Sequence, residues 1–507
     1  MLFSKWHFIL LFLPITFVIY FWLNHKRYIV GGKVWLVVAS LYFYAFWNTK
    51  YLLLILVSII FNFAIGSWLA RTHIANNFEF ENNKTNKNIN ISNRKLILVA
   101  GIFINLLLLA YYKYTDFALE NINMLFGTSF VLPHIILPLA ISFFTFTQIA
   151  YLVDSFKGET AKYDLLNYAL FVTFFPHLIA GPIVHHRQIM SQFSSPWTLA
   201  KRYPNILKAL FIFAIGLFKK VVIADSFAVW ADAGFDGGQV LGFYAAWATS
   251  LSYTFQLYFD FSGYCDMAVG ASLLFNIWLP INFNSPYKAI NIQDFWRRWH
   301  ITLSNFLRDY LYIPLGGNRN SDVQTYLNIL ITFILGGLWH GATWMFVIWG
   351  TLHGCALVVH RVWQKVAWKM PMSIAWSLTF LFVNFTWVFF RAKTLDDAMR
   401  LLRGMFDFSS AYGLSVQSTP TADLAWAGWL ADWLLKVFPA NLLGQIPTYL
   451  ALLVTFYILS CKNSMQLAAE MRVAIGTKRL VFAGALMSIA MYFSLVSTSS
   501  VFLYFNF

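Results

Sequence analysis

Two histidines stand in sequence contexts that suit acid–base chemistry. His340 is flanked by glycines in the string GGLWHGATW, inside an apolar stretch over residues 326–352. His300 ends the basic, aromatic run FWRRWH at residues 295–300. An imidazole at membrane depth is costly, so by default it marks a functional site. Because a neutral imidazole can take a hydroxyl proton near pH 7, the pair predicts proton transfer inside a membrane.

Each histidine also has a structural explanation, which the residues alone leave open. His340 could be a core histidine bonded to a carbonyl group. His300 could belong to an interfacial anchor, with indoles at headgroup level and guanidinium groups on phosphates. His353 and His360, on the next apolar stretch, are expected to support the site or to pack structurally.

Two carboxylates lie in apolar surroundings, Asp260 and Asp266. A carboxylate in such surroundings must be protonated or find a partner. We expect that partner to be Arg297, Arg298 or Arg308. The pairing would serve as a structural ion pair, or it would orient a catalytic histidine.

The sequence predicts no metal site and no bound cofactor. His177, His185 and His186 do not follow a metal-ligand spacing, and the three cysteines are far apart. Distant cysteines also argue against a disulfide framework and against zinc. We interpret the cysteines as small apolar packing residues.

The composition indicates that this chain lies in a lipid membrane and not in water. Of its 507 residues, 59% are hydrophobic and 11% are charged, whereas a soluble domain carries about a quarter charged residues. The chain is therefore predicted to be a polytopic membrane protein. Its net charge of +15 arises from basic residues in short loops beside apolar segments. That pattern is typical of cytoplasmic loops facing anionic lipid and argues against nucleic-acid binding.

The apolar segments predict an all-α membrane bundle of roughly 10–13 transmembrane helices with additional re-entrant or interfacial helices. We expect one membrane-embedded domain over residues 1–507, a polar cytoplasmic loop at 71–95 and an extracytoplasmic loop at 407–441. Residues 294–320 carry too many charges to span and are expected to form an amphipathic helix that ends in a turn. Apolar segments that matter below are 165–184, 206–229, 240–259 and 263–279.

Several strings match one family in order along the chain. They are PLAISFFTF (138–146), GLFKKVVIAD (216–225), DFSGY (260–264), PINFNSPY (280–287) and LWHG (338–341). With these strings the chain resembles the membrane-bound O-acyltransferases (MBOAT), and within them the bacterial alginate O-acetylase branch. The resemblance implies a central tunnel through the bundle. It also implies that His340 is the catalytic histidine and His300 its partner.

The resemblance further implies a substrate and a location. The chain would span the inner membrane of a bacterium. An acyl thioester, expected to be acetyl-CoA, would enter it from the cytoplasm. The acyl group would pass outward for O-acetylation of a cell-envelope polysaccharide such as alginate. An extracytoplasmic acetyltransferase or esterase-like partner would modify the polymer. Tyr504, in the string FLYFNF, is a candidate acyl relay, or alternatively an aromatic residue at the membrane surface.

Other functions stay open from the sequence. Within the family, the acceptor could be peptidoglycan, or the reaction could be D-alanyl transfer to teichoic acid. From another class, a transporter or flippase of a polar envelope precursor also fits broken helices and intramembrane charges. A scaffold of an envelope complex is the third alternative. Replacement of His340 by alanine separates them, because only an acyltransferase would lose turnover while staying folded.

Overall fold

The computed structural model describes residues 1–80, 87–160, 163–366, 370–411, 445–471, 476–496 and 503. Within these ranges every regular element is helical, which confirms the all-α fold class. Seven of the described helices are long and apolar enough to cross a membrane. The chain is therefore a multi-pass membrane protein, whereas the predicted total of roughly 10–13 crossings stays a prediction.

The helices pack into two compact units, each built from separate parts of the chain. Unit 1 comprises Met1–Leu217, Tyr264–Ile281 and Met471–Leu495, and unit 2 comprises Phe218–Gly263, Asn282–Glu470 and Val496–Phe507. The expectation of one domain over the whole chain stays a prediction.

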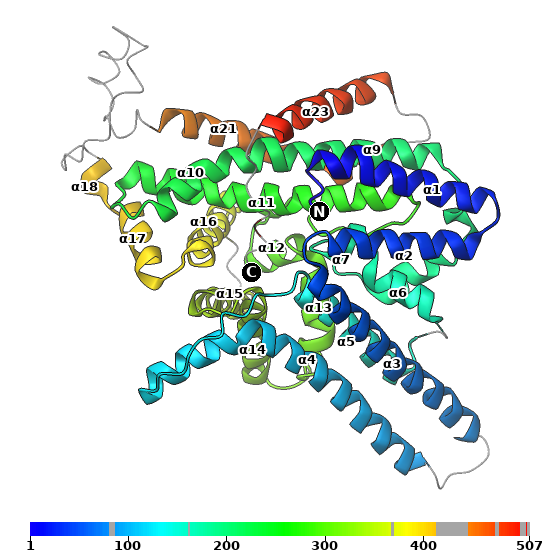
Figure 1. Cartoon of the computed structure of the whole chain (residues 1–507). Helices are drawn as coiled ribbons and strands as arrows, with labels where there is room; N and C mark the ends of the chain where they lie inside the picture. The colour runs from blue at the N-terminus through cyan, green and yellow to red at the C-terminus, as the bar shows by residue number, and fades with distance from the viewer. Residues whose placement is uncertain are drawn as a thin grey trace. The chain divides into compact units, whose positions relative to one another are not determined.

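Unit 1 contains the N-terminal helices and the last helix (Figure 1). One predicted apolar segment, residues 165–184, is broken here into two short helices. Pro176 explains the break, because proline lacks the N–H that continues a helix. The principal helices are α1 (Leu13–His25), α2 (Ile29–Ala45), α3 (Leu52–Phe80), α4 (Lys87–Phe126), α5 (Ile141–Lys157), α6 (Leu165–Thr173), α7 (Phe175–Leu178), α8 (His186–Phe193), α9 (Tyr203–Phe218) and α23 (Thr477–Val496).

The predicted polar loop at 71–95 is largely helical. Helix α3 continues to Phe80 and α4 begins at Lys87, so a loop over the whole range was wrong. Residues 81–86 lie outside the described part. The polar residues have a low intrinsic helix propensity, but this preference is weak and does not end a long helix.

Unit 2 carries the segments that hold both key histidines. Its helices are α10 (Asp225–Asp236), α11 (Phe243–Leu274, which continues into unit 1), α12 (Ile292–Arg298), α13 (Ile301–Leu307), α14 (Asp322–His340), α15 (Trp344–Trp363), α16 (Met372–Arg391), α17 (Leu395–Met405), α18 (Phe408–Ala411), α21 (Ile446–Ser460) and α22 (Ser464–Ala469). A π-helical turn, Lys219–Ala224, joins α9 to α10 within the predicted segment 206–229.

Helix α11 corrects the predicted division of residues 240–279 into two apolar segments. The structure has one continuous helix of 32 residues, Phe243–Leu274. Gly263 was taken as a boundary. A glycine inside a helix costs only about 1 kcal/mol, and no proline lies between the two predicted segments to interrupt the backbone hydrogen bonds.

The predicted amphipathic helix within 294–320 is present but broken. Helices α12 and α13 are separated at Trp299 and His300, and the backbone of His300 has a left-handed φ of 42°. The expected turn follows, with Gly316 and Gly317 both at positive φ. Of the predicted extracytoplasmic loop at 407–441, residues 412–441 lie outside the described part of the chain.

Candidate active site

His340 is the last residue of α14, and close packing of α14 against α15 fixes its position (Figure 1). A Cβ atom at Gly337 would lie 2.3 Å from the carbonyl oxygen of Phe346. A Cβ atom at Gly350 would lie 2.3 Å from that of Phe333. The two helices can therefore approach this closely only because glycine has no side chain.

Aromatic rings surround the His340 imidazole. The ring centroid of Trp349 lies 5.1 Å away and that of Phe390 lies 5.3 Å away, both in edge-on geometry, and Trp339 packs at 5.0 Å. The side chain is 3% exposed. These apolar walls exclude bulk water from the imidazole, which strengthens electrostatic interactions at a reacting group.

His300 lies in the break between α12 and α13, and Asn282 orients it. The His300 Nδ1 atom is 3.1 Å from Asn282 Oδ1, and the same oxygen accepts the backbone N–H of Thr302 at 3.2 Å. A backbone N–H can only donate, so the Asn282 atom is an acceptor and the proton of the neutral ring lies on Nδ1. The Nε2 atom of His300 therefore carries the lone pair.

Burial sets the protonation of His300. The residue is fully buried, and this loss of solvation lowers the pKa of its imidazole to about 3. The ring is neutral at pH 7, so its Nε2 lone pair can accept a proton or a hydrogen bond.

The two histidines lie together in unit 2. Their ring centroids are 6.4 Å apart and the ring planes are inclined at 63°. The two rings therefore do not stack on each other. The resemblance implies that His300 is the partner of His340, and the two rings lie close together; their catalytic roles are proposed below.

The predicted arginine partners of Asp260 were wrong. Lys220 Nζ lies 2.7 Å from Asp260 Oδ1. Arg298 pairs with Asp294 at 2.8 Å, and Arg308 pairs with the aspartate that follows it. The sequence showed charges of opposite sign but not the distances between them. Arg298 is satisfied locally by an aspartate four residues before it on the same helix, and Arg308 by its neighbour in sequence.

Arg297 lines a cavity of about 490 Å³ within unit 2. Three arginines contribute to its wall, together with Trp296 and Thr332: Arg297, Arg308 and Arg361. The Trp296 indole packs 5.9 Å from Trp349, which in turn packs against His340. The cavity thus joins a cationic wall to the aromatic shell of the histidine site. Asp266, on α11, is buried.

His353 has a structural geometry. Its Nδ1 accepts the indole N–H of Trp296 at 3.3 Å, and its Nε2 lies 3.0 Å from the Thr386 hydroxyl. That hydroxyl donates to the carbonyl of Val383, so it accepts from His353. His353 thus holds Trp296 through Nδ1 and is itself fixed by Thr386 through Nε2. His360 lines the cavity.

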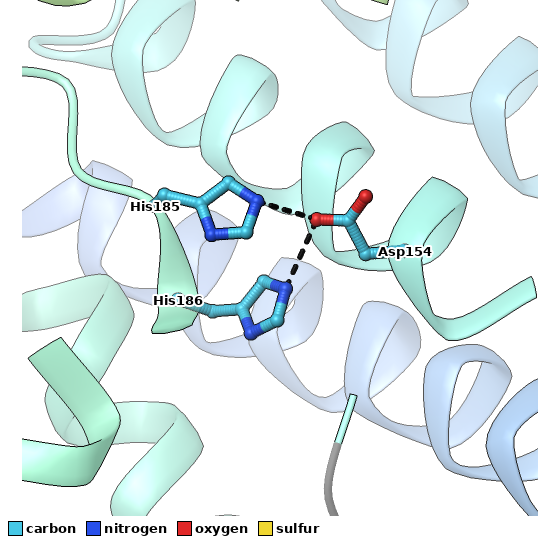
Figure 2. Close-up of side chains that lie close together, drawn as sticks. All are labelled: Asp154, His185 and His186. Carbon is cyan, nitrogen blue, oxygen red and sulfur yellow. Dashed lines mark hydrogen bonds and ion pairs between the residues drawn. The ribbon is translucent and has the colours of Figure 1, made fainter. Parts of the chain in front are cut away.

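A second group of imidazoles lies in unit 1, where Asp154 meets His185 and His186 (Figure 2). The Nε2 atoms of the two histidines lie 2.6 and 3.0 Å from the same oxygen of Asp154. The three groups offer ligand atoms within 4.8 Å of one another. The sequence around His185 and His186 does not reveal this group, because Asp154 lies on α5, 32 residues before His186 in the chain.

Hydrogen bonds account for this second group without an ion. The backbone N–H of Arg187 donates to His185 Nδ1 at 3.3 Å, so the proton of that neutral ring lies on Nε2 and points to Asp154. The Tyr163 hydroxyl lies 3.1 Å from His186 Nδ1 and favours the same tautomer. Burial lowers the pKa of His186. A metal ligand would need a lone pair on Nε2, so this geometry favours a structural cluster, and the expected absence of a metal stays a prediction.

Two residues of the site carried no predicted role. Asn282, which orients His300, lies in the Pro- and Asn-rich string PINFNSPY. Lys220, the partner of Asp260, is a lysine within an apolar run. An intramembrane cation is itself a signal of function or pairing, so Lys220 was findable, whereas the contact of Asn282 depends on the tertiary fold.

Comparison with known proteins finds one matching family model and several relatives. The family model described as "MBOAT, membrane-bound O-acyltransferase family" matches residues 40–395. The chain is 46% identical to a peptidoglycan O-acetyltransferase of Helicobacter pylori over 538 residues, covering 100% of this chain and 98% of that protein. It is 41% identical to a probable alginate O-acetylase of Pseudomonas aeruginosa over 417 residues, covering 81% and 76% respectively. It is 27% identical to a teichoic acid D-alanyltransferase of Bacillus subtilis over 274 residues, covering 50% and 69%.

Proposed function

Because the chain belongs to the membrane-bound O-acyltransferase family and is an O-acyltransferase, we propose that it moves an acetyl group from a cytoplasmic thioester, acetyl-CoA, across the bacterial inner membrane for O-acetylation of a cell-envelope polysaccharide. The observation that carries this proposal is the pair of buried imidazoles, His300 and His340, 6.4 Å apart between ring centroids. Membership of an enzyme family favours this function over the transporter and scaffold alternatives.

We propose peptidoglycan as the acceptor. The relative named for peptidoglycan O-acetylation aligns with the whole of this chain, whereas the relatives named for alginate align with about four fifths of it. Alginate, the acceptor that the sequence resemblance suggested, is the second candidate. The D-alanyltransferase relatives align with half of the chain or less, which makes D-alanyl transfer the least supported of the three acceptor chemistries.

In the proposed reaction, His340 is the general base. One imidazole nitrogen takes the proton of an acceptor hydroxyl while the hydroxyl oxygen attacks the thioester carbonyl. The C–O bond forms, the C–S bond breaks, and the sulfur takes the proton from His340 to leave as a thiol. The single hydroxyl proton goes to His340, so the neutral His300, with its lone pair on Nε2, accepts a hydrogen bond from a second donor group of the acceptor and thereby aligns it.

The cationic cavity supports a donor of the acetyl-CoA class. Arg297 and Arg361 line it, beside Arg308, whose guanidinium is engaged by Asp309, and guanidinium groups bind phosphates with two parallel hydrogen bonds. The cavity volume of about 490 Å³ suits part of such a donor, and its wall residue Trp296 leads to the aromatic shell of His340. The proposed tunnel would continue from this cavity to the histidines.

We also propose an acyl relay on Tyr504, which lies outside the described residues. Its phenol oxygen would take the acetyl group from the thioester, with release of the thiol. An extracytoplasmic acetyltransferase or esterase-like partner would then move the acetyl group from the phenolic ester to the polymer. Replacement of Tyr504 by phenylalanine keeps the aromatic ring and removes only the attacking oxygen. Unchanged O-acetylation by that variant would end the relay proposal.

Deletion of the gene and complementation test the function. We expect O-acetyl groups to disappear from purified peptidoglycan, to return with the wild-type chain and to stay absent with His340→Ala. His185→Ala, in the structural cluster, is the matched control and should restore them. Loss of acetyl from another polysaccharide, with peptidoglycan unaffected, would overturn the acceptor proposal. Normal acetylation by the His340 variant would overturn the catalytic proposal.

A further inference from the structure

A buried group of charges lies at the start of α10 and in the middle of α11, within unit 2. The Lys220 Nζ atom lies 2.7 Å from Oδ1 of Asp225 and 2.7 Å from Oδ1 of Asp260. The three side chains are at most 8% exposed. One lysine faces two carboxylates, so the group needs further hydrogen-bond donors to be stable inside the protein.

The backbone of Leu503 supplies such a donor. Its N–H donates to Asp260 Oδ2 at 2.9 Å, which is a charge-assisted hydrogen bond. Leu503 is separated from Asp260 by more than two hundred residues of sequence and immediately precedes Tyr504. The buried charge group therefore holds the chain at the residue next to the candidate acyl carrier.

The same part of α11 contacts the candidate active site. Phe261 follows Asp260, and its ring packs edge-on against His300 with 4.8 Å between centroids. Asp260 thus connects the Leu503 backbone on one side to the wall of the imidazole pair on the other. Lys220, whose Nζ lies 2.7 Å from Asp260 Oδ1, stabilises the charged form of Asp260, which is the stronger acceptor.

We propose that Lys220, Asp225 and Asp260 form an anchor for the backbone at Leu503, and that Asp260 is a positioning residue for the acyl-transfer reaction. The inference deepens the proposed function and rests on it for the reaction that is positioned. It does not depend on Tyr504 being the acyl carrier, because the anchored group is a backbone N–H one residue away.

Proline at position 503 tests the anchor directly. Leu503→Pro removes the N–H that Asp260 accepts, while Leu503→Ala keeps it and is the matched control. With the full-length chain in detergent or vesicles, we expect Leu503→Pro to slow acetyl transfer from acetyl-CoA about tenfold, the scale of one lost charge-assisted hydrogen bond. Leu503→Ala should stay within about twofold of the wild type.

A double-mutant cycle separates positioning from general stability. Asp260→Ala and Leu503→Pro each remove the same hydrogen bond, so their double variant should be no slower than the slower single variant. Asp225→Asn perturbs the same charge group and acts on Asp260 through Lys220, so it should also combine with Leu503→Pro less than multiplicatively. Multiplicative effects of Asp260→Ala and Leu503→Pro would overturn the anchor.

Hydrogen exchange provides a readout independent of turnover. The peptide that contains Leu503 should exchange its amide hydrogens faster in Asp260→Ala than in the wild type, and unchanged exchange would overturn the proposal. Tyr504→Phe is measured alongside. Normal activity of that variant, together with a slow Leu503→Pro, would end the relay but leave the anchor standing. If His340→Ala abolishes acetyl transfer but the variants at position 503 have wild-type activity, the acyltransferase proposal stands and the anchor proposal is wrong.

Discussion

The molecule uses paired imidazoles in two places, and the oxygen atoms beside them differ. In unit 1, one carboxylate oxygen of Asp154 meets the Nε2 atoms of both His185 and His186. In unit 2, the oxygen beside His300 belongs to the amide of Asn282 and contacts Nδ1. A carboxylate that accepts from both Nε2 atoms fixes the two rings as donors, whereas a neutral amide on Nδ1 leaves the lone pair on Nε2. The first arrangement is structural and the second suits proton transfer.

His340→Ala has the largest expected effect on this contrast. Removal of a general base lowers turnover by about 10²–10⁴-fold, because the acceptor hydroxyl then reacts without transfer of its proton to the enzyme. Transfer of acetyl from radiolabelled acetyl-CoA measures the effect. His185→Ala serves as its counterpart in the other imidazole group, and a comparable loss there would remove the distinction between the two.

Asn282 tests how His300 is oriented. Asn282→Leu removes the acceptor of the His300 Nδ1 proton, so the ring can adopt the other tautomer or rotate. We expect turnover to fall about 10–100-fold, the scale for loss of a hydrogen-bond partner that orients a functional histidine. Asn282→Asp keeps an oxygen at this position but adds a charge, which should shift the pH profile of turnover toward higher pH. If both variants have the turnover and the pH profile of the wild type, Asn282 does not orient His300.

Asp154→Ala should act on stability and not on chemistry. It leaves the two imidazole N–H groups of the cluster without their carboxylate acceptor, and an unsatisfied buried donor costs about 1–3 kcal/mol. Thermal unfolding in detergent measures this change. Turnover per folded molecule should stay within about twofold of the wild type. Asp154→Asn, which keeps one acceptor oxygen, should lose less stability, and the opposite order would contradict the hydrogen-bond assignment.

Acid should weaken the His300 region through proton linkage. The pKa of His300 is lowered to about 3 by burial, while the unfolded imidazole has a value near 6.5. Between these values the unfolded state binds more protons, so the free energy of unfolding falls as the pH drops from about 6.5 toward 3. Unfolding midpoints at about pH 5 and 7.5 should differ more in the wild type than in His300→Asn. Equal differences would contradict the buried, neutral assignment.

Chelation is expected to have the smallest effect. If the Nε2 atoms of His185 and His186 carry protons that Asp154 accepts, and the group binds no metal, prolonged treatment with EDTA leaves both the unfolding temperature and the turnover unchanged. Elemental analysis of the purified chain checks the same point. If EDTA lowers the unfolding temperature, Zn²⁺ restores it, and His186→Ala shows neither effect, the group in unit 1 is a metal site.

Several features followed from the sequence. Long apolar segments predicted an all-α membrane protein, because a helix satisfies its own backbone hydrogen bonds in lipid. The strings around Lys220, Asp260, Asn282 and His340 identified the family. Helix boundaries were less predictable: Gly263 does not interrupt α11, and polar residues after Arg71 do not end α3. Both boundaries depend on packing, which overrides local propensity.

By itself, the sequence determined which side chains were expensive to place in lipid, and therefore that His340 and Asp260 needed a chemical reason to be there. Only the tertiary structure decided which partner each one meets. It gave Asp260 a lysine and a backbone N–H in place of an arginine, and it gave His300 an amide oxygen. The physical reason is that residue type, which the sequence states, sets how costly a side chain is to remove from water, whereas hydrogen bonds act over about 3 Å and join residues that the chain keeps far apart.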